Sequence, residues 1–158
     1  MHRAAFGATE GATIAKLVGE LLEDETARPT LSLVAEVEGQ LVGSVLFSRV
    51  VVEGHEELAG HILAPLAVDE AQQGRGVGSA LIARGLELLR ERGTAFVLVL
   101  GDPRYYSRAG FGPSRDLIPP HELEHPEAWM VQELQPGVLD GVQGPVRCAL
   151  SLSAPEHW

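Results

Sequence analysis

The feature that most constrains the fold is a glycine-rich turn between two apolar segments. Ile62–Val68 is an apolar run bounded by turn residues, which is typical of a buried β-strand. After the turn at Gln72–Gly78, apolar residues recur at helical spacing until Gly93 ends the pattern. Thr94–Leu100 is a second apolar run. This order of strand, turn, helix and strand predicts a βαβ unit, in which a right-handed crossover joins two parallel strands.

The segments around this unit predict a mixed α/β sheet. Apolar residues at three- and four-residue spacing predict a helix from Thr9 to about Glu25, and Leu31–Val37 with Leu41–Val52 predicts a β-hairpin. Pro65 lacks a ladder donor and predicts a bulge or interrupted pairing inside its strand. The pattern further predicts a short helix, an irregular loop and two strands, at Arg104–Ala109, Pro113–Pro126, Trp129–Leu134 and Val146–Leu152.

The composition restricts the class of protein. The 158 residues predict one domain over residues 1–158, and 45% apolar with 22% charged residues excludes wholesale disorder. No apolar run approaches the roughly 20 residues of a membrane span, and the first residues lack the layout of a signal peptide. A single cysteine, Cys148, is typical of a buried thiol in a reducing compartment, so we expect a cytoplasmic protein that does not enter a membrane. Twelve basic and 22 acidic residues give a net charge of −10, which repels nucleic-acid backbones and favours cationic partners.

The glycine turn has the features of an anion-binding site. Its glycines let the backbone turn tightly and approach a ligand closely. The helix that follows presents unpaired N–H groups and the positive end of its dipole. Together they predict a cradle suited to a pyrophosphate, formed by residues Gln73–Ser79. The alternative is a plain tight turn between a strand and a helix.

The spacing of the turn residues excludes two known phosphate motifs. A Walker loop needs a lysine after its last glycine, and Lys16 is the only lysine of the chain. The dinucleotide fingerprint G-x-G-x-x-G fails from Gly74 and from Gly76, because neither sixth position is a glycine. What remains is Q-x-x-G-x-G, read from Gln73 to Gly78.

Two motifs in order resemble the GCN5-related N-acetyltransferase (GNAT) superfamily. Leu66–Glu70 followed by Gln73–Gly78 is similar to its strand and R/Q-x-x-G-x-G/A turn. Tyr105–Phe111 is similar to its aromatic-Tyr-x-x-x-Gly-Phe signature on a short helix. Leu100–Pro103, just before the tyrosines, resembles a bacterial subgroup of predicted acetyltransferases. The resemblance is clear over residues 31–111 and looser in the remainder of the chain.

The resemblance implies a fold and a cosubstrate. The fold would be α/β, a single domain with a mixed, mostly antiparallel sheet in which a parallel strand pair splays apart between flanking helices. Acetyl-CoA would bind at the splay, with its pantetheine arm along the strand edge and the amide of Leu66 facing the thioester carbonyl to stabilise an oxyanion. The implied cofactor-binding residues are Leu66, Ala67, Val68, Gln73, Gly74, Arg75, Gly76, Val77, Gly78 and Ser79.

The resemblance also implies direct attack of an amine on acetyl-CoA, without an enzyme nucleophile. Tyr106 matches the family tyrosine that protonates the departing thiolate, and its alternative is a packing role beside Phe111. Tyr105 is expected to stack or to lie in the core, and Asp102 to cap the short helix. No cluster of Cys, His or carboxylate residues has metal-ligand spacing, so no metal is expected.

Two departures from the family pattern leave questions open. Some members carry a glutamate as general base four residues before the oxyanion position, where this chain has Ile62. His61, His55, Glu53 or a chain of water molecules are the alternatives. Members also begin with a β-strand, whereas Met1–Gly7 is too short and too weakly patterned to supply it. We expect that strand to be missing or replaced by a partner chain, and a homodimer is one alternative.

Two functions follow as hypotheses. The first is an N-acetyltransferase that transfers an acetyl group from acetyl-CoA to a primary amine of a small molecule or a protein. The second is a catalytically degenerate module that binds acyl-CoA as a sensor or interaction partner. The matched tyrosine and the intact glycine turn favour the first, and the missing glutamate favours the second.

Overall fold

The computed structural model describes residues 14–158 of the chain. Residues 14–23 are helical and belong to the predicted N-terminal helix, whose first residues, from Thr9, fall outside the described part. The predicted lack of a strand at Met1–Gly7 falls outside it as well.

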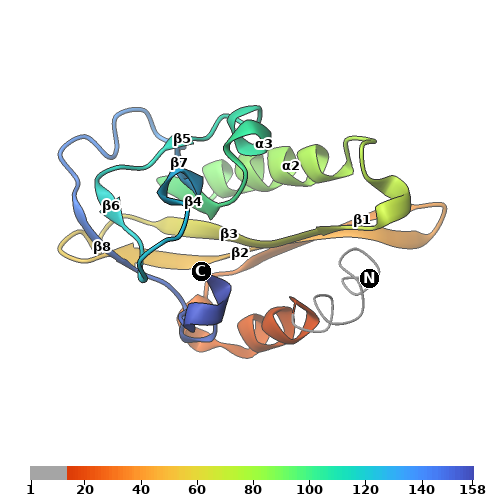
Figure 1. Cartoon of the computed structure of the whole chain (residues 1–158), viewed down its shortest axis with the longest axis horizontal. Coiled ribbons are helices and arrows are strands. Elements are labelled where there is room, and N and C mark those ends of the chain that lie inside the picture. The colour runs from red at the N-terminus through yellow and green to blue at the C-terminus, as the bar shows by residue number, and fades with distance from the viewer. Residues whose placement is uncertain (1–13) are drawn as a thin grey trace.

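A mixed sheet forms the centre of the molecule (Figure 1). In the described part of the chain, eight strands pair in the order β5-β7-β4-β3-β2-β8-β6, and β1 adds to β2. Most neighbours are antiparallel, while β3–β4 and β6–β8 are parallel. The strands are β1 (Leu31–Val37), β2 (Gln40–Val52), β3 (Gly60–Val68), β4 (Phe96–Leu100), β5 (Gly112–Pro113), β6 (Leu117–Ile118), β7 (Trp129–Glu133) and β8 (Gly144–Arg147). The predicted hairpin is therefore confirmed as β1–β2.

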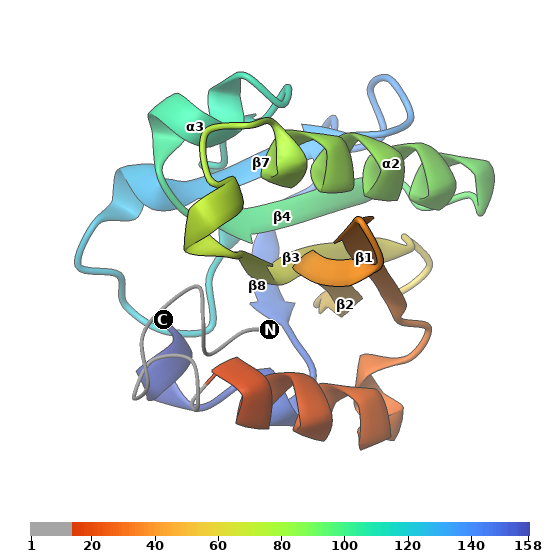
Figure 2. The ribbon, with the colours of Figure 1, turned by 90° about the vertical axis from the view of Figure 1, so that its right-hand side faces the viewer.

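Helices cover both faces of the sheet. Helices α2 (Val77–Glu91) and α3 (Pro103–Ser107) lie on one face, and the helix over residues 14–23 lies on the other (Figure 2). Short 3₁₀ turns complete the chain at η1 (Glu25–Ala27), η2 (Glu70–Gln72), η3 (Pro126–Ala128), η4 (Leu150–Leu152) and η5 (Pro155–His157). None of the helices in the described residues combines the length and the apolar character needed to cross a membrane.

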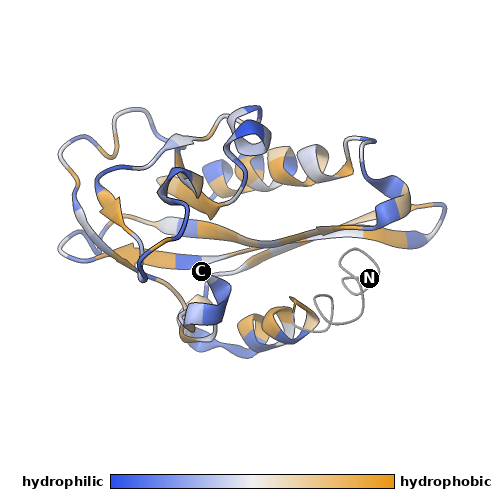
Figure 3. Ribbon diagram, viewed as in Figure 1, coloured by the Kyte–Doolittle hydropathy of each residue, from blue (hydrophilic) through white to orange (hydrophobic). Residues whose placement is uncertain are grey.

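Each face of the sheet buries its own hydrophobic cluster, because successive strand residues point to opposite sides. Phe47 packs with α2 residues in one cluster, and Phe96 packs with Leu21 of the N-terminal helix in the other. Hydrophobic residues concentrate along the strands, and hydrophilic ones along the connecting turns (Figure 3). Helix α2 lies close to β2 at Gly85, where a Cβ atom would overlap the Phe47 ring.

The predicted βαβ unit is confirmed as β3–α2–β4. The two strands pair in parallel from Gly60 opposite Phe96 to Leu63 opposite Val99. Strand β3 then continues to Val68 beside β2 alone, because β4 no longer follows it. The parallel pair therefore splays apart, as the family resemblance implies, and one edge of β3 is left without a strand partner among the described residues.

Two sequence predictions need correction near the C-terminus. The predicted strand Val146–Leu152 ends at Arg147, and η4 follows instead. Its backbone is turned toward η1, because the amides of Leu150 and Ser151 donate to side chains there, at 2.9 Å each. The loop predicted as irregular contains the two-residue strand β6, which pairs with β8.

Candidate functional site

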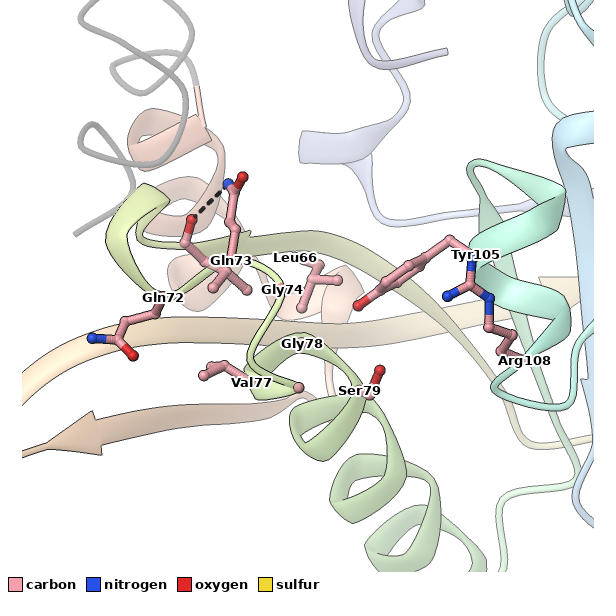
Figure 4. A pocket seen from close by; sticks show the side chains of 11 residues that line it. Leu66, Gln72, Gln73, Gly74, Val77, Gly78, Ser79, Tyr105 and Arg108 are labelled. Atoms are coloured by element: carbon pink, nitrogen blue, oxygen red, sulfur yellow. Dashed lines mark hydrogen bonds between the residues drawn. The ribbon is translucent and has the colours of Figure 1, made fainter.

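A pocket of about 510 Å³ lies where β3, the glycine turn and α3 meet (Figure 4). It is bounded on one side by the free edge of β3, on the second by the first turn of α2, and on the third by α3. Its lining residues are Leu66, Val68, Gln72, Gln73, Gly74, Gly76, Val77, Gly78, Ser79, Tyr105 and Arg108.

The β3 side of the pocket presents backbone groups. The amide of Asp69 donates to the Val42 carbonyl of β2 at 2.8 Å. Because successive residues of an antiparallel strand bond to opposite edges, Val68 and Leu66 direct their backbone groups away from β2. For Val68, a hydrogen bond confirms this direction of the carbonyl: the Gln73 Nε2 donates to the Val68 carbonyl at 3.1 Å. That bond also ties the turn to the strand.

The glycine turn presents free amides to the same pocket. Gly76 is the N-cap of α2 and has φ +81°, a left-handed conformation that favours glycine. In residues 14–158, no protein acceptor takes the amides of Gly74, Gly76, Val77, Gly78 or Ser79. The first intrahelical bond joins the Ala80 amide to the Gly76 carbonyl at 2.9 Å. Free N–H groups at a helix start form an anion cradle.

Most of the predicted cofactor-binding residues meet in this pocket, and two of them do not line it. Ala67 is 1% exposed and packs into the sheet. Arg75 is exposed beside a different groove, between β1 and α2. Its amide donates to the Gln72 carbonyl at 3.3 Å, and the Gln73 amide donates to the Glu70 carbonyl at 3.3 Å. These two amides hold the turn itself in shape.

Tyr106, the predicted general acid, lies just behind the pocket wall. It is 9% exposed, and its ring packs edge-on against Tyr105 at 5.0 Å and Phe111 at 5.8 Å between centroids. Within the described residues its hydroxyl has no hydrogen-bond partner. Burial, with a smaller effect of Tyr105, raises the pKa of the Tyr106 phenol, so that it stays protonated at neutral pH. Its role as an acid stays a prediction.

The three side chains considered as general base lie at the other end of β3. His61 is buried, its Nε2 donates to the Pro29 carbonyl at 2.9 Å, and burial lowers its pKa. His55 and Glu53 belong to the segment before Gly60, where β3 begins. The pocket is near Val68, where β3 ends, and none of the three lines it.

Sequence reasoning missed three residues of the pocket or gave them another role. Gln72 and Arg108 were not predicted, and Tyr105 both stacks on Tyr106 and lines the pocket. The spacing of Tyr105 and Arg108, three residues apart on a short helix, is the signal that could have paired them. The predicted cap of that helix is confirmed, because the Asp102 carboxylate accepts from the Arg104 amide at 2.9 Å. In the part of the chain that is described, no three His, Cys, Asp or Glu side chains gather to hold a metal.

Fold and site together define a class of protein, in which a splayed parallel strand pair opens onto a glycine turn with free amides. The model of the acetyltransferase (GNAT) family matches residues 5–111. The chain belongs to this family.

Known relatives agree with this assignment. The chain is 46% identical over 153 residues to the uncharacterized N-acetyltransferase YjhQ of Escherichia coli (strain K12), covering 92% of this chain and 81% of that protein. The structure of the GNAT family N-acetyltransferase YhbS from Escherichia coli, in complex with CoA, matches with a TM-score of 0.84 and 39% identity over 96% of this chain and 82% of that one. A GNAT family acetyltransferase from Brucella melitensis, in complex with acetyl-CoA, matches with a TM-score of 0.73 and 32% identity over 95% of this chain and 86% of that one.

Proposed function

We propose that this protein is an acetyl-CoA-dependent N-acetyltransferase that acetylates a primary amine of a small molecule or a protein. One observation carries the proposal: the free edge of β3 and the five free amides of the glycine turn line the same pocket. Its membership of the acetyltransferase family and the CoA-bound relatives support it.

The residues present fit the two polar parts of CoA. The amides at Gly74 and at 76–79 would hold the diphosphate at the positive end of α2. The backbone groups of Leu66 and Val68 would pair with the amides of the pantetheine arm, as an added strand does. Both assignments use backbone atoms. The ligand must therefore come close to the backbone, which glycines permit at the turn and the unpaired edge permits at β3.

The chemistry assigned to the chain is limited to charge stabilisation and proton transfer. Bound acetyl-CoA supplies an acetyl group activated as a thioester. The Leu66 amide would donate a hydrogen bond to the thioester carbonyl oxygen, where negative charge develops during attack by the amine. Tyr106 would hold the proton that the departing thiolate takes up, and its raised pKa keeps that proton in place until then. With the three base candidates at the far end of β3, we assign removal of the amine proton to water.

A thiol-release assay tests the proposal. The purified chain is mixed with acetyl-CoA and a panel of amines of different size and charge, and free CoA thiol is measured over time. We expect turnover that depends on both the amine and the protein. Tight CoA binding without turnover on any amine would overturn the enzymatic assignment.

The same assay separates the second candidate, an acyl-CoA-binding sensor. The observation that favours a sensor is Ile62, which is 2% exposed and stands where some relatives of this family carry a glutamate base. A sensor would gain thermal stability with CoA, by about 2.7 kcal/mol at 100 times Kd, and would release no thiol.

A further inference from the structure

On the α3 side of the pocket, two side chains lie across from the glycine turn: Tyr105 of the helix and Arg108, its C-cap residue. Helix α3 begins directly after β4, and its capping residue Asp102 fixes where its first turn starts. Tyr105 and Arg108 are three residues apart, so both lie on one side of the helix. Both line the pocket across from the glycine turn, while Tyr106 turns inward.

The Tyr105 hydroxyl reaches the first turn of α2. Figure 4 shows the ring directed across the pocket, with the hydroxyl toward Leu66 and Gly78. A Cβ atom at Gly78 would overlap that hydroxyl, so the oxygen occupies the space beside the free amides of Gly78 and Ser79. Within the described residues no hydrogen bond occupies the Tyr105 hydroxyl, which leaves its O–H available to a ligand held by those amides.

Arg108 adds a positive charge to the same wall. Its Nε donates to the Arg104 carbonyl at 3.2 Å, and in the described part of the chain no carboxylate pairs with its terminal nitrogens. Arg104, by contrast, points to Asp102 at 3.7 Å and does not line the pocket. The chain has a net charge of −10, so an arginine at the pocket supplies the local attraction that a polyanionic cofactor needs. A guanidinium suits phosphate oxygens, because its fork donates two parallel hydrogen bonds.

We propose that Tyr105 and Arg108 bind the diphosphate of CoA from the α3 side and complete the cradle that the α2 amides begin. The inference rests on the proposed function, since it takes CoA as the ligand. It assigns the phosphate contact to two side chains outside the glycine motif. It also separates the roles of the adjacent tyrosines: Tyr105 positions the cofactor, and the buried Tyr106 keeps the role of proton donor given to it under the proposed function.

Calorimetric titration of the full chain with three ligands tests the inference. CoA carries both the diphosphate and the 3′-phosphate, dephospho-CoA keeps only the diphosphate, and pantetheine has neither. We expect Arg108→Gln to weaken CoA and dephospho-CoA by the same factor, about tenfold or more, and to leave pantetheine unchanged. Tyr105→Phe should weaken the same two ligands by a smaller common factor, because a neutral hydroxyl bonds less strongly. Arg104→Gln is the matched control, and it should leave all three affinities within twofold of the unmodified chain.

Each other outcome overturns the inference. A loss confined to CoA would place the guanidinium on the 3′-phosphate instead. An equal loss of affinity in Arg104→Gln would mean that any positive charge on α3 attracts the ligand to the same extent, without a specific contact from Arg108. If Arg108→Gln and Tyr105→Phe both bind CoA as tightly as the unmodified chain, the inference is overturned and the proposed function is not. No CoA binding by the unmodified chain would overturn the proposed function with it. Thermal melts of every variant confirm that the titrated protein is folded.

Discussion

The hydroxyl of Tyr105 lies where a side chain at Gly78 would begin. A Cβ atom at Gly78 would overlap that oxygen, yet it would be 3.6 Å from the ring carbon Cζ that carries the oxygen. We therefore expect Gly78→Ala to lower the free energy of unfolding by about 1–3 kcal/mol, as overpacking does. In a Tyr105→Phe background the same change should be neutral or stabilising, because the overlap is gone and alanine favours a helix over glycine by about 1 kcal/mol.

Urea denaturation of the four proteins of this cycle measures the coupling between the two positions. The coupling energy should exceed 1 kcal/mol in size, as for residues in direct contact (about 0.5–3 kcal/mol). Strict additivity would mean that the Tyr105 ring moves freely away from α2, and it would contradict the close approach of its hydroxyl to Gly78.

Tyr106→Phe should reduce kcat by about 10² to 10⁴, because it removes a proton donor that acts only as the thiolate leaves. The KM for acetyl-CoA should change little. Stability should also change little, because the hydroxyl has no protein partner in residues 14–158 and the ring keeps its contacts with Tyr105 and Phe111. Steady-state kinetics on a competent amine measures both constants. Tyr105→Phe is the control, and we expect the opposite result for it: a raised KM for acetyl-CoA and an unchanged kcat.

Gly76→Ala should abolish tight CoA binding. Apart from its chain neighbours, an added Cβ atom would have no protein atom within 4 Å, so the methyl group would project into open space at a residue that lines the pocket. The left-handed φ of +81° would also strain any side chain there by about 1 kcal/mol or more. Gly39→Ala carries a similar strain, at φ +80° in the β1–β2 turn, and it lies outside the pocket. Titration of both variants separates strain from blocked binding, and equal CoA affinity in the two would assign the glycine turn a structural role only.

Asp24 should make stability depend on acid pH. Burial raises its pKa, but hydrogen bonds from Thr26 and Ser151 outweigh that effect and hold the pKa at about 2 instead of 3.8. A depressed folded-state pKa stabilises the protein above pH 3.8, and this contribution disappears as the pH falls toward 2. Asp24→Asn should cost about 1 kcal/mol at neutral pH, discounted for solvent exposure, and nothing at pH near 2. Denaturation of this variant and of the exposed Glu23→Gln variant across that pH range measures the free energy of unfolding. An equal loss of stability in both variants would show that the hydrogen bonds of Asp24 contribute nothing specific.

His61 should add a second pH dependence, closer to neutrality. Burial first, and then the charges of Arg92 and Arg49, lowers its pKa, so the folded protein keeps the ring neutral while the unfolded chain protonates it below about 6.5. Stability should therefore be full above that pH and decrease below it. In His61→Gln the decrease between about pH 7 and pH 5 should be smaller, whereas the exposed His125→Gln should keep it. Unfolding curves at several pH values measure the difference.

Much of the site could be predicted from local spacing. The turn at Gln73–Gly78 needs only neighbouring residues to form, so its motif reports its geometry directly. The cap at Asp102 is equally local, because its carboxylate bonds an amide two residues away. The roles of Ala67 and Arg75 were harder, because a strand residue and a turn residue can each face away from a ligand while their neighbours face it.

Long-range contacts explain the predictions that failed. The segment after Arg147 is apolar enough for a strand, but side chains of η1, more than 120 residues earlier in the chain, bend it into η4. His61 was one of several alternatives for the general base, and its sequence neighbours do not show which end of β3 the pocket adjoins. The fold instead places it against Pro29 and Thr94, at the end of β3 opposite the pocket.

By itself, the sequence determined the βαβ unit, the glycine turn at the start of α2 and the family of the protein, because each depends on residue types at short, regular spacing. Only the tertiary structure decided where β4 parts from β3 and which of two adjacent tyrosines faces the pocket. The first depends on how far β3 and β4 stay paired, from Gly60 opposite Phe96 to Leu63 opposite Val99, partners that are 36 positions apart in the sequence. The second depends on the rotation of α3 over the sheet, which buries Tyr106 against Phe111 and leaves Tyr105 beside Gly78.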